Sequence, residues 1–164
     1  MKFFLILFSF AVLSTGCLKK DTGCPYTVRN ITVPAAEITL VENYLNAAGI
    51  TNATKHSSGM YYVIENAGTG TNVANQCSQV AINYKGQLTN GQVFDEGNNR
   101  IFTLGTLIEG WKIALPLIKD GGKIKLFIPP SLGYGAQDVR DQAGNIVIPG
   151  NSVLVFDISL ISTN

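Results

Sequence analysis

The sequence is poor in the residues that metal sites and nucleophilic active sites need. Its 164 residues include three cysteines and a single histidine, His56. These four residues lack the spacing of zinc ligands, and no Gly-x-Ser-x-Gly nucleophile motif is present. The sequence therefore argues against zinc hydrolases and serine hydrolases, and we expect neither a metal nor a cofactor.

Charge is also scarce, and the two signs are balanced. There are 12 basic and 11 acidic residues, and the only adjacent basic pair is Lys19-Lys20. Proteins that bind a phosphate backbone need clustered Lys and Arg, so nucleic acid is not an expected partner. Hydrophobic residues make up 46% of the chain, which is enough for the core of one domain. We expect a monomer.

One continuous apolar run stands near the N-terminus. It covers residues 3–13, follows Lys2, and is too short to span a bilayer. Small residues at 14–16 precede Cys17, so residues 1–16 are predicted to be a signal peptide. The position of Cys17 resembles a bacterial lipobox, in which the cysteine is acylated and becomes the first residue after cleavage. We expect a lipid-anchored protein of the bacterial cell envelope; the alternative is plain secretion with a free thiol.

The other two cysteines form an even pair if Cys17 carries lipid. Disulfides persist in the oxidising compartments outside the cytoplasm, so we predict a bond between Cys24 and Cys77. It would close a loop of about 54 residues and contribute about 4 kcal/mol in the chain-entropy model. The alternative is that both remain inert thiols.

Composition divides the remaining chain into three parts. Residues 17–33 are polar, contain glycine and proline, and are predicted to be a tether. Residues 34–58 form a helical extension, in which apolar side chains recur at helical spacing over 35–48 and Gly49 is a candidate C-terminal cap. Residues 59–164 form the main domain.

The main domain has the pattern of an antiparallel sheet. Apolar and polar side chains alternate along residues 80–88, 124–128 and 154–160, which predicts strands with one face in solvent. Asn90-Gly91 is a hairpin turn signal. The only other helix candidate is 108–118, where Pro116 limits the length. These elements predict an α+β domain in which a sheet curves around one short helix.

Six separated segments of this domain resemble the FKBP-type peptidyl-prolyl cis-trans isomerases. They run in order through residues 59–161, and they are Val80–Gly86, Asn90–Asp95, Phe102–Gly105, Leu107–Trp111, Ile128–Gly135 and Ile148–Asp157. The resemblance implies an FKBP-like sheet of five or six antiparallel strands wrapped around a short helix. It also implies that the chain isomerises X-Pro bonds in proline-containing polypeptide clients.

The resemblance also implies a site. Trp111 would be the floor of a pocket, with Asp95 as a polar group at its rim and Val147 and Ile148 in an apolar loop above it. The walls would be Tyr84, Phe94, Leu107, Ile108, Tyr134 and Phe156. The backbone N–H of Ile108 and the hydroxyl of Tyr134 would donate to substrate carbonyls. In this assignment Asp95, Tyr134, Ile108 and Trp111 are catalytic, and the others bind substrate.

Two departures from the family pattern leave other functions open. Arg100 stands where the family often has an aromatic wall residue, and the loop at 136–145 is longer than in the smallest members. From the resemblance as a whole, we expect a membrane-tethered isomerase that assists the folding of exported proteins. One alternative is a chaperone or adaptor that binds proline-containing segments with little turnover. Another is a purely structural envelope lipoprotein.

Overall fold

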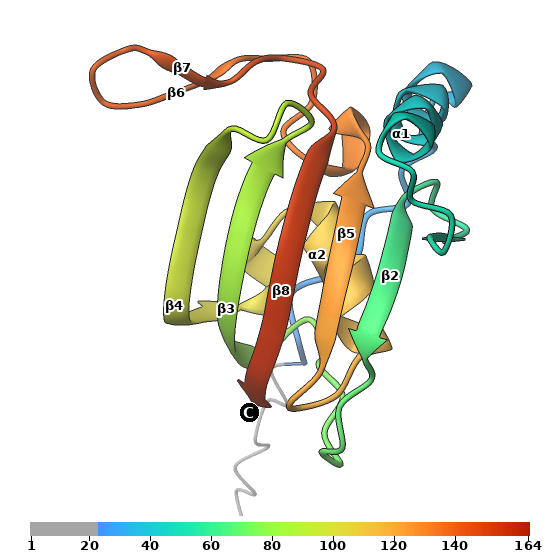
Figure 1. Ribbon diagram of the computed structural model, residues 1–164. Coiled ribbons are helices and arrows are strands. Elements are labelled where there is room, and N and C mark those ends of the chain that lie inside the picture. The colour runs from blue at the N-terminus through green and yellow to red at the C-terminus, as the bar shows by residue number, and fades with distance from the viewer. Residues whose placement is uncertain (1–22) are drawn as a thin grey trace, which may run out of the picture.

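A computed structural model describes residues 23–164. The predicted signal peptide and Cys17 lie outside the described residues. Six strands form one antiparallel sheet in the order β1-β2-β5-β8-β3-β4, and β6 and β7 form a separate hairpin (Figure 1). The strands are β1 Thr54–Lys55, β2 Tyr61–Asn66, β3 Gln79–Leu88, β4 Val93–Thr103, β5 Lys123–Ile128, β6 Val139–Arg140, β7 Ile146–Ile148 and β8 Leu154–Thr163. The helices are α1 Ala35–Ala47 and α2 Glu109–Ala114, with 3-10 turns η1 Leu104–Thr106, η2 Leu115–Leu117 and η3 Pro130–Leu132.

The short helix α2 lies across one face of the sheet, as the sequence predicts (Figure 1). Alternate residues of β5 and β8 point toward it, including Leu126, Phe156 and Ile158, and all three are buried. The polar residues between them face the other way, where Lys125 pairs with Asp157 at 2.9 Å. The period of two in the sequence therefore decides which side of the sheet holds the main core.

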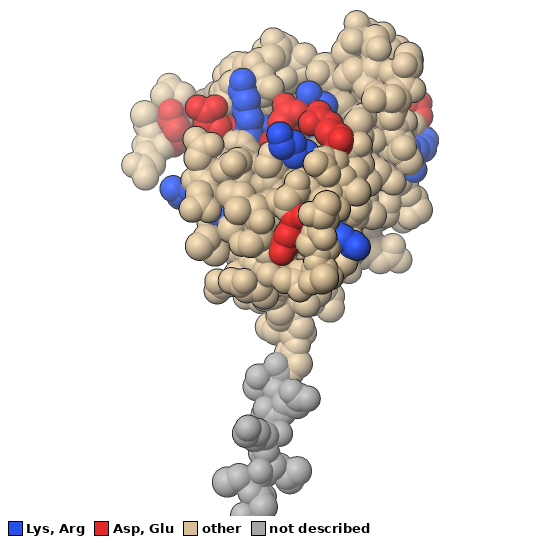
Figure 2. Space-filling model, turned by 60° about the horizontal axis from the view of Figure 1, so that its bottom comes forward, with Lys and Arg blue, Asp and Glu red and all other residues tan. Residues whose placement is uncertain are grey.

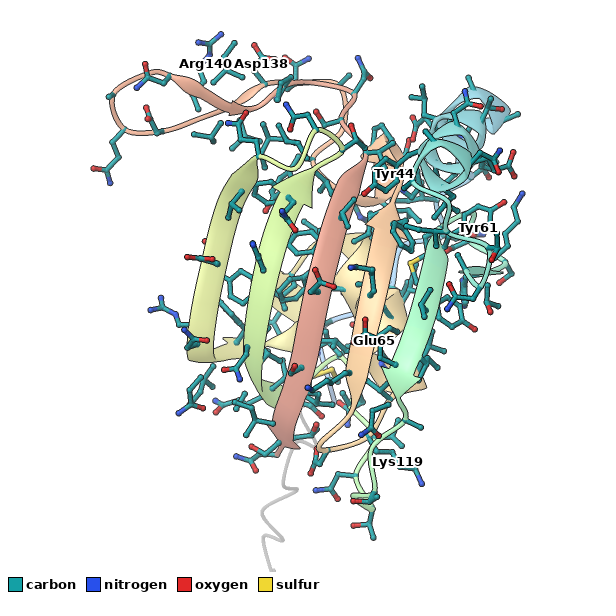
Figure 3. The ribbon with its side chains drawn as sticks, in the orientation of Figure 1. Tyr44, Tyr61, Glu65, Lys119, Asp138 and Arg140 are labelled. Carbon is teal, nitrogen blue, oxygen red and sulfur yellow. A yellow bond between two sulfur atoms is a disulfide. The ribbon has the colours of Figure 1, made fainter. Side chains whose placement is uncertain are left out.

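The helix α1 covers the upper part of the opposite face (Figures 1 and 3). Its buried residues Val41 and Leu45 join a second core cluster with Phe127 and Val155. Gly49 has φ of +68° just after the helix, which fits the predicted C-terminal cap. A carboxylate on α1 also reaches η3, because Glu37 accepts hydrogen bonds from the Ser131 amide at 2.8 Å and its hydroxyl at 2.6 Å.

The hairpin of β6 and β7 extends from the sheet as an arm (Figure 1). Asp138 and Arg140 lie on it and form an ion pair at 3.1 Å (Figure 3). At its tip the Asp141 carboxylate accepts hydrogen bonds from the amides of Ala143 and Asn145 at 2.9 and 2.8 Å. The residues at 136–145, which are predicted as an enlarged loop, thus include β6 and the turn of a hairpin that β7 completes.

The part of the predicted tether that the structure describes lies against the domain. Val33 is buried, Ile31 packs on the main core, and Cys24 and Cys77 form a disulfide with their Cα atoms 5.6 Å apart. Residues 24–33 are therefore bound to the domain and do not form a free linker. Within residues 23–164, no helix has the length and apolar character to cross a bilayer.

Acidic and basic residues are interspersed over the surface. On the face shown in Figure 2 they lie beside one another, and most of the face carries no charge. This fits the balanced composition of the chain.

The second core cluster yields a stability prediction. Phe127 is fully buried between the sheet and α1, 6.1 Å from the Tyr44 ring. We expect Phe127→Ala to lower the free energy of unfolding by about 3–5 kcal/mol, because it opens a cavity that α1 cannot fill. Urea denaturation measures the change. Ile161→Ala, at a side chain 42% exposed, is the control and is expected to change it by less than about 0.5 kcal/mol. Equal effects of the two substitutions would contradict this account of α1.

Candidate active site

A cavity of about 450 Å³ opens between α2 and the concave face of the sheet. Ten residues line it: Tyr84, Asp95, Arg100, Phe102, Thr106, Leu107, Ile108, Trp111, Tyr134 and Phe156. They come from β3, β4, β8, the η1–α2 segment and the loop after η3. Trp111 is only 4% exposed, and it lies at the centre of these elements as the predicted floor.

Aromatic rings build the walls by edge-to-face packing. The Trp111 ring lies 5.3 Å from the Tyr84 ring and 5.0 Å from the Phe156 ring, with interplanar angles of 76° and 85°. Phe102 packs on Tyr84 at 6.1 Å, and Phe94 on Phe156 at 5.4 Å. Edge-to-face pairs hold their rings in defined orientations, so the cavity keeps its shape without a ligand.

Polar groups are few and lie at the rim. The Tyr84 hydroxyl donates to the Asp95 carboxylate at 2.9 Å. Burial and then this carboxylate raise the pKa of Tyr84 to about 12. Burial, helped by the charge of Asp95, also raises the pKa of Tyr134. Both phenols therefore stay protonated at neutral pH, and Asp95 is occupied as a hydrogen-bond acceptor.

Two donors are free to meet a ligand. The Ile108 amide precedes α2 and has no acceptor among residues 23–164, because the first N–H groups of a helix lack a partner within it. The Tyr134 hydroxyl also has no hydrogen-bond partner within these residues, and its side chain is 44% exposed. An apolar floor with two donors at the edge suits a carbonyl-bearing ligand whose ring is buried.

Most residues that the sequence assigns to the pocket do line it. Phe94 does not, but it supports the wall through its contact with Phe156. Val147 and Ile148 also do not line the cavity; they lie in β7 of the arm and pack against the core. Phe102 and Thr106 are wall residues that the sequence reasoning did not assign, although Phe102 lies in one of the six family segments.

A bulge in β4 brings Arg100 to the cavity. β3 pairs Ile82 with Arg100 but Tyr84 with Gly97, so two residues on β4 stand opposite one on β3, which is one residue more than regular pairing. One of them, Asn99, has φ of +48°, and its amide donates to the Asn83 side chain at 2.7 Å. A Cβ atom at Gly97 would lie 2.6 Å from Cγ of Arg100, so only glycine leaves room for that side chain. Arg100 is thus held at the rim beside Tyr84.

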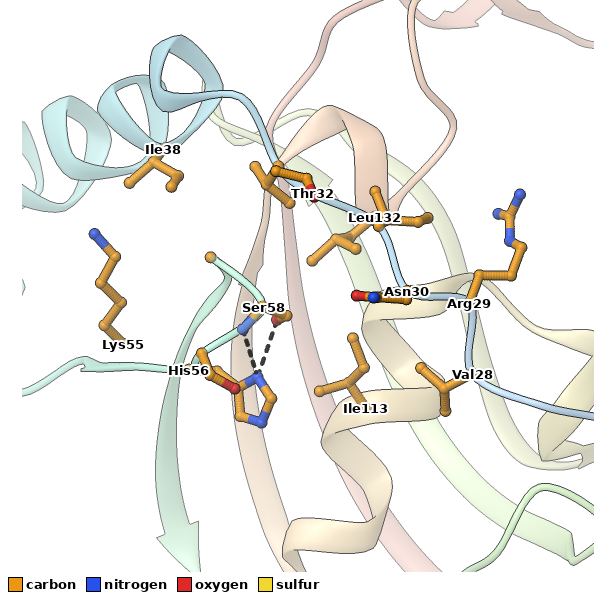
Figure 4. Close-up of a pocket in the computed structure, with 14 residues that line it drawn as sticks. Val28, Arg29, Asn30, Thr32, Ile38, Lys55, His56, Ser58, Ile113 and Leu132 are labelled. Carbon is orange, nitrogen blue, oxygen red and sulfur yellow. Dashed lines mark hydrogen bonds between the residues drawn. The ribbon is translucent and has the colours of Figure 1, made fainter.

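A second and larger hollow, of about 720 Å³, lies away from this site (Figure 4). It separates residues 28–33 from the turn between β1 and β2. There the ring Nδ1 of His56 accepts a hydrogen bond from the Ser58 amide at 3.0 Å. None of the aromatic residues that pack around Trp111 lines this hollow, so the site predicted from the sequence is the smaller cavity.

The comparisons with known proteins agree on one family. The family model of FKBP-type peptidyl-prolyl cis-trans isomerases matches residues 70–161, which is more than half of the chain. The chain belongs to this family. All ten residues that line the cavity fall inside the matched region.

Similar proteins include the FKBP-type isomerase FkpA from two bacteria. The Buchnera aphidicola protein (subsp. Schizaphis graminum) is 41% identical over 112 residues, which cover 66% of this chain and 42% of that protein. The Escherichia coli K12 protein is 43% identical over 109 residues, which cover 64% of this chain and 38% of that protein. The chain thus spans about two-fifths of the length of these relatives.

Solved structures share the fold. The crystal structure of FkpA from Escherichia coli matches with a TM-score of 0.66 and 36% identity, covering 79% of this chain and 60% of that one. A peptidyl-prolyl isomerase from Pseudomonas syringae matches with a TM-score of 0.67 and 26% identity, covering 82% and 98%. These likenesses confirm the predicted fold class.

The Tyr84 hydroxyl gives a titration prediction. Since its pKa is raised to about 12, the protein should keep this phenol protonated at pH 10, where an ordinary tyrosine is half ionised. The difference in absorbance at 295 nm between wild type and Tyr84→Phe should therefore titrate near pH 12. In the unfolded chain this phenol ionises near pH 10, below its pKa in the folded protein. Its ionisation therefore lowers the free energy of unfolding as the pH rises from 10 toward 12. A difference midpoint near pH 10 would show that the phenol is not buried against Asp95.

Proposed function

We propose that this protein catalyses cis/trans isomerisation of X-Pro peptide bonds in polypeptide clients. The observation that carries the proposal is the cavity over Trp111, which combines apolar aromatic walls with two unpaired donors at its edge. Membership of the isomerase family supports the same reaction.

The reaction needs no nucleophile. Resonance holds a prolyl amide planar behind a barrier of about 18–20 kcal/mol. At the transition state the amide is twisted and has lost its resonance and much of its dipole, so a low-polarity cavity favours it over the planar ground state. The walls exclude water from one side of the proline ring while the Ile108 amide and the Tyr134 hydroxyl hold flanking carbonyls.

Asp95 has an orienting role in this mechanism. Its carboxylate accepts the Tyr84 hydroxyl proton in a hydrogen bond, which fixes the Tyr84 ring against Trp111. No proton has to be removed from the substrate during rotation about the amide bond. Asp95 therefore shapes and polarises the rim and does not act as a general base.

The predicted signal peptide and lipobox support a location in the bacterial cell envelope for this activity. We propose that acylated Cys17 anchors the domain to a membrane, where it assists the folding of exported proteins. Each buried methylene contributes about 0.8 kcal/mol, so several acyl chains on one cysteine give stable attachment.

A protease-coupled assay on short Xaa-Pro peptides tests the reaction. We expect wild type to accelerate isomerisation. Trp111→Ala and Asp95→Ala should each lower kcat/KM by about tenfold or more, because they remove the floor and release Tyr84. Tyr134→Phe removes one hydrogen bond, so a smaller loss of about three- to tenfold is expected.

The matched control for these variants is Tyr44→Phe, which removes a phenol on α1, on the opposite face of the sheet from the cavity. Circular dichroism must show that every variant is folded. If folded wild type gives no more acceleration than folded Trp111→Ala, the proposed reaction is wrong.

Arg100 favours a second candidate function, the binding of proline-containing segments with little turnover. Its guanidinium adds a charge to the rim of a cavity that otherwise has apolar walls. Isothermal titration with a proline-containing peptide, run beside the kinetic assay, separates the two functions. Peptide binding that persists in Asp95→Ala, together with absent catalysis in wild type, would establish a binding module.

The lipid anchor has its own test. We expect the protein expressed in a bacterium to fractionate with membranes and to carry the mass of a diacylglyceryl group on Cys17. Cys17→Ser should release it into the soluble fraction without changing kcat/KM. A soluble wild-type protein with an unmodified Cys17 would instead support plain secretion.

A further inference from the structure

A segment outside the matched family region contacts the active site from behind. We call residues 24–33 the strap. It precedes the family match at 70–161, and it lies against the η1–α2 segment, residues 104–114, which supplies Leu107, Ile108 and Trp111 to the cavity. These contacts are made by Tyr26 and Arg29.

Arg29 binds a buried carboxylate beside the catalytic amide. Its backbone N–H donates to Oε2 of Glu109 at 3.1 Å, and its Nε donates to Oε1 at 2.7 Å. Glu109 follows Ile108 directly, is only 2% exposed, and also pairs with Lys112 at 3.0 Å. Burial would raise the pKa of Glu109, but its bonds to Arg29 and Lys112 outweigh burial and lower it. The charged carboxylate thus depends on the strap.

Tyr26 contacts Gly105, which precedes the wall residue Thr106. A Cβ atom at Gly105 would lie 2.3 Å from Cβ and Cγ of Tyr26, so only the bare glycine backbone allows this approach. Gly105 is buried in η1, and its amide donates to the carbonyl of Gln76 at 2.7 Å. The strap and the loop before β3 therefore meet at the start of the η1–α2 segment.

The same loop also reaches the far end of α2. The Gln76 side chain donates to the carbonyl of Lys112 at 3.1 Å. The next residue, Cys77, carries the disulfide to Cys24 at the start of the strap. Residues 105–112 are therefore held at Gly105, Glu109 and Lys112 by two chain segments, and one covalent bond joins those segments.

We propose that the strap, locked by the Cys24–Cys77 disulfide, is a positioning element for the active site, with Arg29 and Glu109 as positioning residues. This rests on the proposed isomerase function. Loss of the strap leaves a buried carboxylate short of two donors and exposes the back of η1. The Ile108 amide and the Trp111 ring would then shift relative to the sheet, and a misplacement of 1 Å can change a rate by about a hundredfold.

The disulfide makes this arrangement sensitive to reduction. Cys24 and Cys77 are both exposed, so a dithiol can reach the bond. Thiolate attack breaks the S–S bond through a mixed disulfide; the dithiol then closes its own disulfide, and two protein thiols are formed. Two electrons and two protons pass from the dithiol to the protein. The strap is then held by its noncovalent contacts alone.

The experiment compares oxidised wild type with the double variant Cys24→Ser/Cys77→Ser and with Arg29→Met, which keeps the disulfide. Lys125→Met is the matched control, because it removes the ion pair with Asp157 on the opposite face of the sheet. Assays are run well below the thermal midpoint of every variant. The readouts are kcat/KM, amide hydrogen exchange of residues 105–112, and the emission of Trp111, the only tryptophan in the chain.

We expect the double variant and Arg29→Met each to lose about tenfold in kcat/KM, to change the Trp111 emission, and to speed exchange in residues 105–112. Arg29→Lys keeps the charge and the backbone donor, so it should recover part of the loss. Lys125→Met should match wild type. Wild-type kcat/KM, emission and exchange in both strap variants would overturn the proposal. An inactive wild type would overturn the isomerase function instead, and emission and exchange would still test the strap.

Discussion

The site depends on the packing of one short helix against a curved sheet. α2 has six residues and no side-chain cap at its N-terminus, so it would not be stable in isolation. Its Trp111 ring is inserted between the Tyr84 and Phe156 rings. A Cβ atom at Gly110 would lie 2.6 Å from the Ile128 side chain, so the helix approaches β5 as closely as its backbone allows. The floor of the cavity and the position of the Ile108 amide both follow from this contact.

The same packing explains why a site without a nucleophile or a general base can serve this reaction. The carboxylates of Glu109 and Asp95 already have partners in the fold: Glu109 binds Arg29 and Lys112, and Asp95 binds Tyr84. The residues that line the cavity otherwise offer aromatic surface and donors from Ile108, Tyr134, Arg100 and the Trp111 indole, whose Nε1 has no hydrogen-bond partner among residues 23–164. Rotation about an amide bond requires a weakly polar surrounding and fixed carbonyls, so further ionisable groups would add little.

The sequence predicts the elements that have a regular period. Alternation along β3, β5 and β8 identifies which residues face the core, and Asn90-Gly91 forms the expected turn, with a hydrogen bond from Gly91 to Leu88. Helical spacing predicts α1 to within one residue. Segments without a regular period are harder to predict from the sequence. Residues 24–33 have the polar composition of a linker, yet Arg29 and Tyr26 bind partners far away in sequence, and such contacts leave no local signal.

In the cavity, too, residues within a local sequence pattern can be predicted, whereas positions that depend on strand pairing cannot. Tyr84 and Trp111 can be assigned from the six family segments, but the rim depends on strand register. The bulge that brings Arg100 beside Tyr84 depends on Asn99 in a left-handed conformation, which asparagine tolerates better than most residues. Val147 and Ile148 do not line the cavity because they lie in β7, where Ile148 is buried in the main core and Val147 packs against it. The rim of the cavity is therefore shaped by the bulge in β4, while the floor is set by the buried packing of α2.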